Sequence, residues 1–394
     1  MQNDPIVITG AARTPIGSFQ GALAPVSAPD LGAAAVAAAI ERSAVSAESI
    51  EEVVMGCVLP AGLRQAPARQ AALGAGLPMS TPCTTINKMC GSGMKAAMLA
   101  HDHILAGSGR ILVSGGLESM SNAPYLLPKA RGGYRLGNGE LLDHMFVDGL
   151  EDAYEPGKLM GHFAEDCVKR YGFSREDQDD FAIESLTRAT EAIENGAFRD
   201  EIVSVAVPGR KETVLVDTDE QPLCANIEKI PSLRPAFQKD GTVTPANSSS
   251  ISDGAAALVM MRLSDAEKGG HVPLARVLGH ASFAQEPGWF TTAPVFAIQK
   301  LLDTLEWDVS TVDLFEVNEA FASVPVAWLQ ETGADPARLN VHGGAISLGH
   351  PLGASGTKLM TTLLSALQTH DKRWGLQTMC EGGGLANVTI IERL

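Results

Sequence analysis

The stretch Gly343-Gly-Ala-Ile-Ser-Leu-Gly-His350-Pro-Leu-Gly-Ala-Ser-Gly356 places one histidine inside a long glycine-rich turn. Thirty residues after that histidine, Cys380-Glu-Gly-Gly-Gly384 places a cysteine beside a second glycine turn. A third turn, Asn87-Lys-Met-Cys90-Gly-Ser-Gly93, directly precedes the strongly helix-forming residues 94–100. Each of the three turns therefore carries one side chain that can transfer a proton.

Short apolar runs alternate with alanine-rich segments along the N-terminal part of the chain. Residues 6–9, 53–55 and 111–114 are typical of buried strands, and residues 31–40 are typical of a helix. This alternation predicts an α/β fold.

The middle of the chain has a different character. Residues 132–157 and 213–250 are irregular, and a surface helix is expected between them over residues 176–197. Regular strand and helix signals resume at residues 254–261. We therefore expect a loop-rich region inserted into the α/β fold.

Two short patterns occur twice and suggest a duplicated unit. Ser92-Gly-Met-Lys95 recurs as Ser355-Gly-Thr-Lys358, and Val113-Ser-Gly-Gly-Leu117 recurs in similar form as Glu381-Gly-Gly-Gly-Leu385. Both pairs keep the same order and comparable separation, which favours two related α/β halves.

Composition excludes several classes of protein. With 394 residues the chain is long enough for two or three domains, and its net charge of -16 argues against nucleic acid as a partner. No apolar run reaches the roughly 20 residues of a membrane span, and no basic, apolar leader is visible at the N-terminus. These features predict a soluble, cytoplasmic protein without a membrane partner.

The cysteines and histidines do not suggest a metal site or disulfides. Six cysteines are scattered without a C-x-x-C pair. His101 and His103 could in principle bind a metal, but side chains two residues apart on a helix do not face the same way. We therefore expect no metal.

The chemistry of the three turns points to acyl transfer. Cys90 precedes a helix, whose dipole is expected to favour its thiolate, so Cys90 is the candidate nucleophile. If the turns converge, His350 could take its proton and Cys380 could act as the base for a weakly acidic carbon. The neighbouring glycines would let backbone N–H groups reach an oxyanion.

Ordinary structural roles are the alternative. A lone cysteine is usually a buried core residue, and this interpretation is kept for Cys57, Cys83, Cys167 and Cys224. Asn318, in the segment Asn318-Glu-Ala-Phe-Ala322, would by itself fit a simple strand-end cap equally well.

Taken together, these segments resemble the signature sequences of the thiolases. The resemblance covers nearly the whole chain and is strongest to the thiolases that act on acetoacetyl-CoA. It implies a five-layered αβαβα fold made of two similar halves with an inserted loop domain. The N-terminal half would comprise residues 1–120 plus 250–272, the coenzyme A-binding loop domain 121–249, and the C-terminal half 273–394.

The resemblance also implies roles for the residues of the turns. Cys90 would become acylated, His350 would activate it, and Cys380 would deprotonate the methyl group of a second acetyl-CoA. Asn318 would position a water that, with His350, binds one thioester oxygen. The N–H groups of Cys90 and Gly382 would form the second oxyanion site.

Substrate contacts follow by the same resemblance. Coenzyme A would lie near Met160, Ser249 and Phe321, and Phe290 would border the acyl pocket. The residues that usually meet the adenine end have no clear match, and Lys229 is the candidate substitute.

The expected activity is the reversible condensation of two acetyl-CoA molecules to acetoacetyl-CoA and coenzyme A, without a metal or redox cofactor. Two alternatives remain open: a degradative 3-ketoacyl-CoA thiolase for longer chains, and a catalytically silent thiolase-like lipid-binding protein. The resemblance further implies a homotetramer, possibly a dimer.

Overall fold

The computed structural model describes residues 4–209 and 211–394. Its main feature is a ten-stranded sheet formed by β1 (Ile6–Arg13), β2 (Gly17–Ser18), β3 (Glu52–Gly56), β4 (Cys83–Ile86), β5 (Ile111–Ser119), β10 (Ser252–Arg262), β11 (Ala275–Ala284), β12 (Leu314–Val317), β13 (Trp374–Glu381) and β14 (Leu385–Arg393). The strand order is β12-β13-β14-β11-β1-β10-β5-β3-β4, and β2 pairs with β10.

The sheet consists of two similar halves. Strands β1 and β11 join them through the pairs Val7–Arg276 and Ile8–Ala275, whereas β1 pairs with β10 along its whole length. The order β3-β5-β10-β1 in one half matches β12-β13-β14-β11 in the other. The predicted duplication is therefore visible in the topology.

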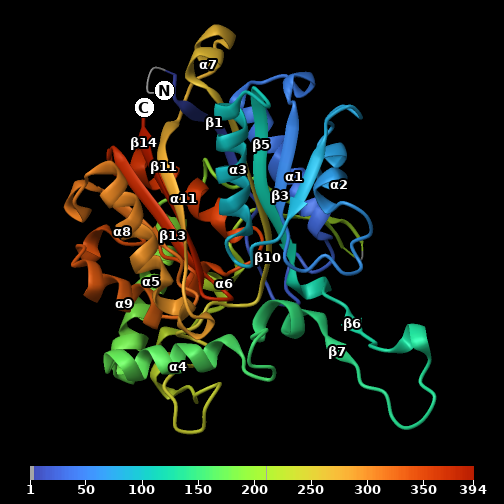
Figure 1. Cartoon of the computed structure of the whole chain (residues 1–394), viewed down its shortest axis with the longest axis vertical. Coiled ribbons are helices and arrows are strands. Elements are labelled where there is room, and N and C mark those ends of the chain that lie inside the picture. Colours follow the sequence, from blue (N-terminus) through green and yellow to red (C-terminus); the bar gives the residue numbers. More distant parts are fainter. Residues whose placement is uncertain (1–3, 210) are drawn as a thin grey trace.

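Helices form three further layers around the two half-sheets (Figure 1). Helices α1 (Ala28–Ser43) and α2 (Pro67–Gly74) contact the outer face of the N-terminal half, and α8 (Ala293–Leu305), with α9 (Ser323–Thr332) beside it, covers the C-terminal half. Helices α3 (Ser92–Ala106) and α11 (Ser355–Thr369) pack against each other between the half-sheets. This arrangement is the predicted αβαβα layering.

Glycines let the two central helices touch at their first turns. A Cβ atom at Gly93 would lie 2.7 Å from Thr357 Oγ1, and one at Gly356 would lie 2.4 Å from the Met94 nitrogen. Larger residues would therefore push the helices apart. This contact explains the repeated Ser-Gly-x-Lys pattern, which begins both α3 and α11.

The second repeated pattern does not mark equivalent positions. Residues 113–117 lie inside β5, whereas residues 382–384 form the turn between β13 and β14. The resemblance between these two segments therefore reflects a shared need for small residues and not a shared place in the fold.

The middle of the chain contributes most of the remaining elements. These are β6 (Tyr125–Leu126), β7 (Leu142–Asp143), α4 (Met160–Tyr171), α5 (Arg175–Glu194), β8 (Val205–Pro208), β9 (Thr213–Val216) and α6 (Glu220–Cys224); α7 (Leu263–Gly269) and α10 (Ala345–Leu348) belong to the two halves. The predicted surface helix is α5, but its face with Ala182, Leu186 and Ala189 is buried. The predicted domain boundaries stay a prediction.

Two features describe the outside of the molecule. The hairpin of β6 and β7 projects away from the layers at the end where α4 lies (Figure 1). No helix within residues 4–209 and 211–394 is both long and apolar enough to cross a membrane.

Candidate active site

Cys90 lies in the loop between β4 and α3, held against the end of β13. Met89 adopts a left-handed conformation with φ of 48°, which turns the chain sharply before the cysteine. A Cβ atom at Gly91 would lie 1.7 Å from Glu381 Oε1, so only glycine allows this close approach. The two cysteine-bearing segments are therefore brought together by a glycine.

The Cys90 thiol is protonated in the resting protein. Burial, together with the nearby Glu381 carboxylate, raises its pKa to about 12, although the backbone N–H groups of Cys90 and Gly382 both interact with the sulfur and lower the pKa. The prediction that the helix start favours the thiolate is therefore wrong for the resting protein, because burial outweighs the helix dipole. Cys90 needs a base.

His350 has the protonation state that a base requires. Burial, with a smaller effect of Lys358, lowers the pKa of His350 to about 3, so the ring is neutral at physiological pH. Its Nδ1 lies 2.6 Å from Ser355 Oγ, and the Ser355 hydroxyl lies 2.9 Å from the Pro351 carbonyl oxygen. If the hydroxyl donates to that carbonyl, Nδ1–H must donate to Ser355 Oγ. Nε2 then carries a lone pair.

The surroundings of Nε2 show whether that lone pair is used within the described part of the chain. Nε2 of His350 is buried and has no hydrogen-bond partner among the described residues. A buried polar atom without a partner is rare unless it serves a ligand or a water. The geometry of His350 therefore fits proton transfer.

Asn318 and Cys380 stand at the same end of neighbouring parallel strands. The Asn318 N–H donates to the Thr378 carbonyl at 3.0 Å, two residues before Cys380. The Asn318 Nδ2 is buried and, within the part of the chain that the structure describes, has no partner. It is therefore free to hold a water or a substrate oxygen, as the resemblance implies.

The two thiols interact electrostatically. Burial raises the pKa of Cys380 well above its ordinary value, and Cys90 and Glu381 raise it further. Cys380 therefore also rests as a thiol. Because deprotonating either sulfur makes the other harder to deprotonate, the pair favours at most one thiolate at a time.

The predicted acyl-pocket residues surround Cys380. Cys380 belongs to one buried cluster with Phe290, Phe321 and Phe163, against which Met160 packs. The rings of Phe163 and Phe290 meet edge to face with centroids 6.0 Å apart. Aromatic side chains thus pack in the same buried cluster as Cys380.

Gly382 connects the two parts of the site. A Cβ atom placed on Gly382 would lie 3.5 Å from the methyl carbon of Met89 and 3.9 Å from the sulfur of Met160. The turn after Cys380 therefore touches both the residue preceding Cys90 and the predicted coenzyme A contact.

Two residues near the candidate site, Phe237 and Ser355, are only weakly indicated by the sequence. Phe237 packs edge to face on Phe321, with centroids 6.1 Å apart, and its ring would lie 2.3 Å from a Cβ atom at Gly161. Ser355 was visible only as the repeated serine at the start of a helix. The predicted residue Ser249 lies beside Phe321, since the Ser249 N–H donates to the carbonyl of the preceding residue, Ala320, at 2.9 Å.

Lys229 lies outside this group. It is exposed and borders a separate cleft of about 320 Å³ with Ala246 and Ile346. One lining residue of this cleft, Ala246, is three positions before Ser249 in the sequence. The contact of Lys229 with the adenine end of coenzyme A stays a prediction.

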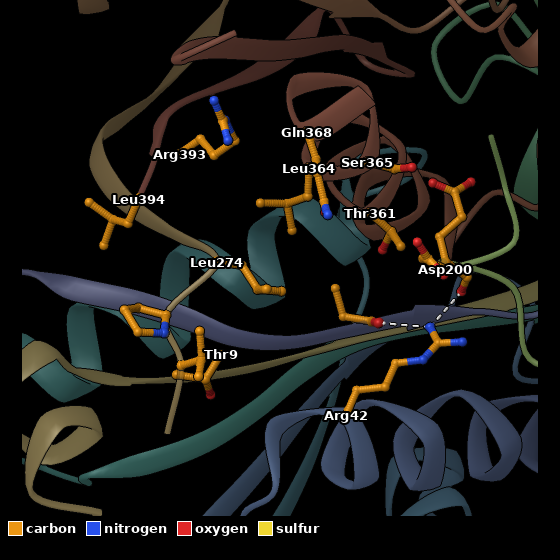
Figure 2. Close-up of a pocket in the computed structure, with 14 residues that line it drawn as sticks. Thr9, Arg42, Asp200, Leu274, Thr361, Leu364, Ser365, Gln368, Arg393 and Leu394 are labelled. Atoms are coloured by element: carbon orange, nitrogen blue, oxygen red, sulfur yellow. Dashed lines mark hydrogen bonds between the residues drawn. The ribbon is translucent and has the colours of Figure 1, made fainter. Parts of the chain in front are cut away.

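Another cavity, of about 330 Å³, has no thiol in its wall. Arg42 and Arg393 reach it from opposite sides (Figure 2). The Arg42 guanidinium donates to the carbonyls of Ala11, Glu201 and Ile202, and that of Arg393 donates to Lys372 and Asp371. Both cations are already engaged, so this cavity does not resemble an anion site.

Comparisons with known proteins identify the family. The family profile "Thiolase, N-terminal domain" matches residues 6–264, and "Thiolase, C-terminal domain" matches residues 271–393. The chain belongs to the thiolase family. Curated relatives named acetyl-CoA acetyltransferase include one from Escherichia coli, 49% identical over 98% of this chain and 99% of the relative. Another, from Schizosaccharomyces pombe, is 47% identical over 100% of both chains.

A solved structure agrees with this assignment. The crystal structure of a thiolase from Ascaris suum in complex with coenzyme A has a TM-score of 0.94 and 43% sequence identity, covering 99% of this chain and 100% of that chain. The predicted thiolase fold is therefore confirmed, and membership of the family makes this chain an acyltransferase.

Proposed function

We propose that this thiolase is an acetyl-CoA acetyltransferase that reversibly converts two acetyl-CoA molecules to acetoacetyl-CoA and coenzyme A. The observation that carries the proposal is a neutral, buried His350 whose Nε2 has no partner among the described residues, together with the electrostatic interaction between the Cys90 and Cys380 thiols. The names of relatives 47 to 49% identical along nearly the whole chain support the two-carbon substrate.

In the first half-reaction Cys90 attacks the thioester carbon of acetyl-CoA. His350 Nε2 takes the thiol proton, and the N–H groups of Cys90 and Gly382 stabilise the oxyanion. The bond to the coenzyme A sulfur breaks, and the Cys380 thiol donates a proton to that sulfur. The protein then holds an acetyl group on Cys90, a thiolate on Cys380 and a protonated His350.

In the second half-reaction the Cys380 thiolate removes a methyl proton from another acetyl-CoA. Its raised pKa makes it a strong base once it is formed. Asn318 Nδ2 and His350 stabilise the enolate oxygen through a water. The carbanion attacks the acetyl group on Cys90, and the departing Cys90 thiolate recovers its proton from His350.

A homotetramer is the proposed assembly. The β6–β7 hairpin carries large apolar side chains on its surface, of which Leu136 is 97% and Leu141 is 64% exposed. Exposed apolar groups on a projecting hairpin mark association sites. Replacing both leucines by aspartate should lower the mass measured by light scattering, whereas an unchanged mass would contradict this role.

The function is tested by intact-protein mass after incubation with acetyl-CoA. The unmodified protein and a Cys224→Ala control, in which an exposed cysteine is lost, should gain one acetyl group. The Cys90→Ala variant should gain none. An acetyl group that stays on Cys90→Ala, or never forms on the unmodified protein, would show that the proposed chemistry is wrong.

A further inference from the structure

Three side chains that play no part in the acyl-transfer site converge on one point of the surface between the two halves. His101 and Asp102 are on α3, and His280 is on β11. His101 Nδ1 lies 3.2 Å from His280 Nε2 and 3.2 Å from Asp102 Oδ1, and His280 Nε2 lies 3.0 Å from the same carboxylate oxygen. The three atoms form a nearly equilateral triangle.

Hydrogen bonds alone do not satisfy this triangle. If both ring nitrogens are protonated, the edge between the imidazoles brings two N–H groups together. If one is unprotonated, at least one edge joins two lone pairs, because the ionised carboxylate has no proton to give. Every arrangement of protons therefore leaves one repulsive or unsatisfied edge. A cation in contact with all three atoms removes that problem.

The dimensions of the triangle suit a transition-metal ion. An ion about 2.0 to 2.1 Å from each atom would see angles of roughly 95 to 105° between its ligands, between octahedral and tetrahedral values. The two imidazole rings are nearly perpendicular, at 87°, with centroids 4.9 Å apart. The side chains of His101 and His280 are mostly buried, at 12% and 15% exposed, whereas Asp102 is 49% exposed. The site thus has two positioned nitrogens and access from solvent.

We propose that His101, Asp102 and His280 form a binding site for a divalent transition-metal ion such as Zn²⁺. Two imidazoles and one carboxylate are ligands that zinc, cobalt and nickel accept. Because α3 belongs to the N-terminal half and β11 to the C-terminal half, the ion joins the two halves. His101 is about 14 Å along the helix from Ser92 at the catalytic end, so the ion is structural and takes no part in acyl transfer.

This site cannot be recognised from the sequence, because His280 is distant along the chain from His101 and Asp102. The sequence suggests His101 and His103 as a possible pair of ligands, but His103 turns to the other side of α3, where its Nδ1 lies 3.2 Å from Glu52 Oε2. The third ligand, His280, comes from a strand 179 residues further on. The fold therefore brings His101 together with Asp102 and His280, and not with His103, as possible metal ligands.

The test is a zinc titration of the full-length protein after treatment with EDTA and its removal, in competition with a chromophoric chelator. We expect one zinc ion per chain with micromolar or tighter affinity. His280→Gln and Asp102→Asn should each weaken binding by about tenfold or more, since even changes beyond the direct ligands cost about that much. Zinc should also raise the melting temperature of the unmodified protein but not of His280→Gln.

Two variants serve as matched controls. His103→Gln removes a histidine from the same helix, and His370→Gln disrupts a separate pair in which the His370 and His342 Nε2 atoms lie 3.2 Å apart. Both should bind zinc like the unmodified protein. Asp102 lies on the surface, so Asp102→Asn should fold even if His280→Gln does not. Binding weaker than millimolar, or equal affinity in the unmodified protein and Asp102→Asn, would overturn the proposal.

Discussion

Replacing Ser355 by alanine tests how the protein prepares its base. The Ser355 hydroxyl is the acceptor that holds the Nδ1–H of His350, at 2.6 Å, in a buried site. In Ser355→Ala that N–H loses its partner, or the ring adopts the other tautomer. In the first case the ring is no longer held in position, and in the second case Nε2 carries the proton and has no lone pair. We therefore expect slower acetylation of Cys90, with little change in the affinity for acetyl-CoA.

The size of the effect follows from the lost hydrogen bond. Leaving a buried donor without a partner costs about 1 to 3 kcal/mol. At about 1.36 kcal/mol for each factor of ten in rate, acetylation should slow roughly 5- to 150-fold. Ser355→Thr keeps the hydroxyl and should recover most of the rate.

Rapid quenching followed by mass spectrometry measures this step directly, because acetylation precedes condensation. Thr361→Val is the matched control: it removes another buried hydroxyl of α11 that donates to the carbonyl four residues earlier, at 3.0 Å. It should acetylate at nearly the normal rate. Normal acetylation of Ser355→Ala, or an equal loss in Thr361→Val, would refute the role given to Ser355.

Three further predictions concern the thiols, the acyl pocket and pH. Cys380→Ala should still be acetylated at Cys90, if more slowly, but should not exchange the methyl protons of acetyl-CoA with deuterium; continued exchange would exclude Cys380 as the base. We expect the unmodified protein to prefer acetoacetyl-CoA over a six-carbon 3-ketoacyl-CoA by about tenfold or more in kcat/KM. Phe290→Ala should reduce this preference, and an unchanged ratio of kcat/KM values would place Phe290 away from the acyl chain. The folded-state pKa of His350 is about 3, against an ordinary value of 6.5, so the unfolded chain binds the extra proton and stability falls as pH drops from about 6.5 towards 3. His350→Gln should make the measured fall in melting temperature over this range shallower, and an identical slope would contradict the buried, neutral ring.

The alternation of apolar runs and helical segments is sufficient to predict an α/β fold, whereas the five layers follow from the resemblance to the thiolases. Apolar runs such as residues 6–9 and 111–114 mark strands because their side chains are buried on both faces of the sheet. The approach of backbone N–H groups to an oxyanion, expected from the glycines beside Cys90, stays a prediction, and the structure shows in addition that Gly91 leaves room for the Glu381 side chain. These are local properties of the chain, which sequence patterns record directly.

Properties that depend on the assembled site were not predictable in this way. The helix start argued for a reactive Cys90 thiolate, but the pKa is set mainly by burial and by a carboxylate nearly 300 residues away in the chain. In the same way, His280 reaches His101 only after the two halves pack together. Electrostatic environments and long-range contacts of this kind appear only once the fold is known.

The duplication itself explains why the site needs both halves. Glu118, near the end of β5, accepts the N–H of Gly353 at 2.8 Å, in the loop between His350 and α11. Glu381, at the end of β13, lies 2.9 Å from the Lys88 amine, in the loop that carries Cys90. Burial raises the pKa of both carboxyl groups to about 7.

Each half thus supplies an acidic side chain that supports the catalytic loop of the other half. Cys90 comes from the N-terminal half, whereas His350 and Cys380 come from the C-terminal half, so neither half holds the complete proposed site. Because the supporting carboxyl groups are buried at the junction, separating the halves would expose them and release both loops at once. In the proposed mechanism, catalysis and the packing of the two halves therefore depend on the same contacts.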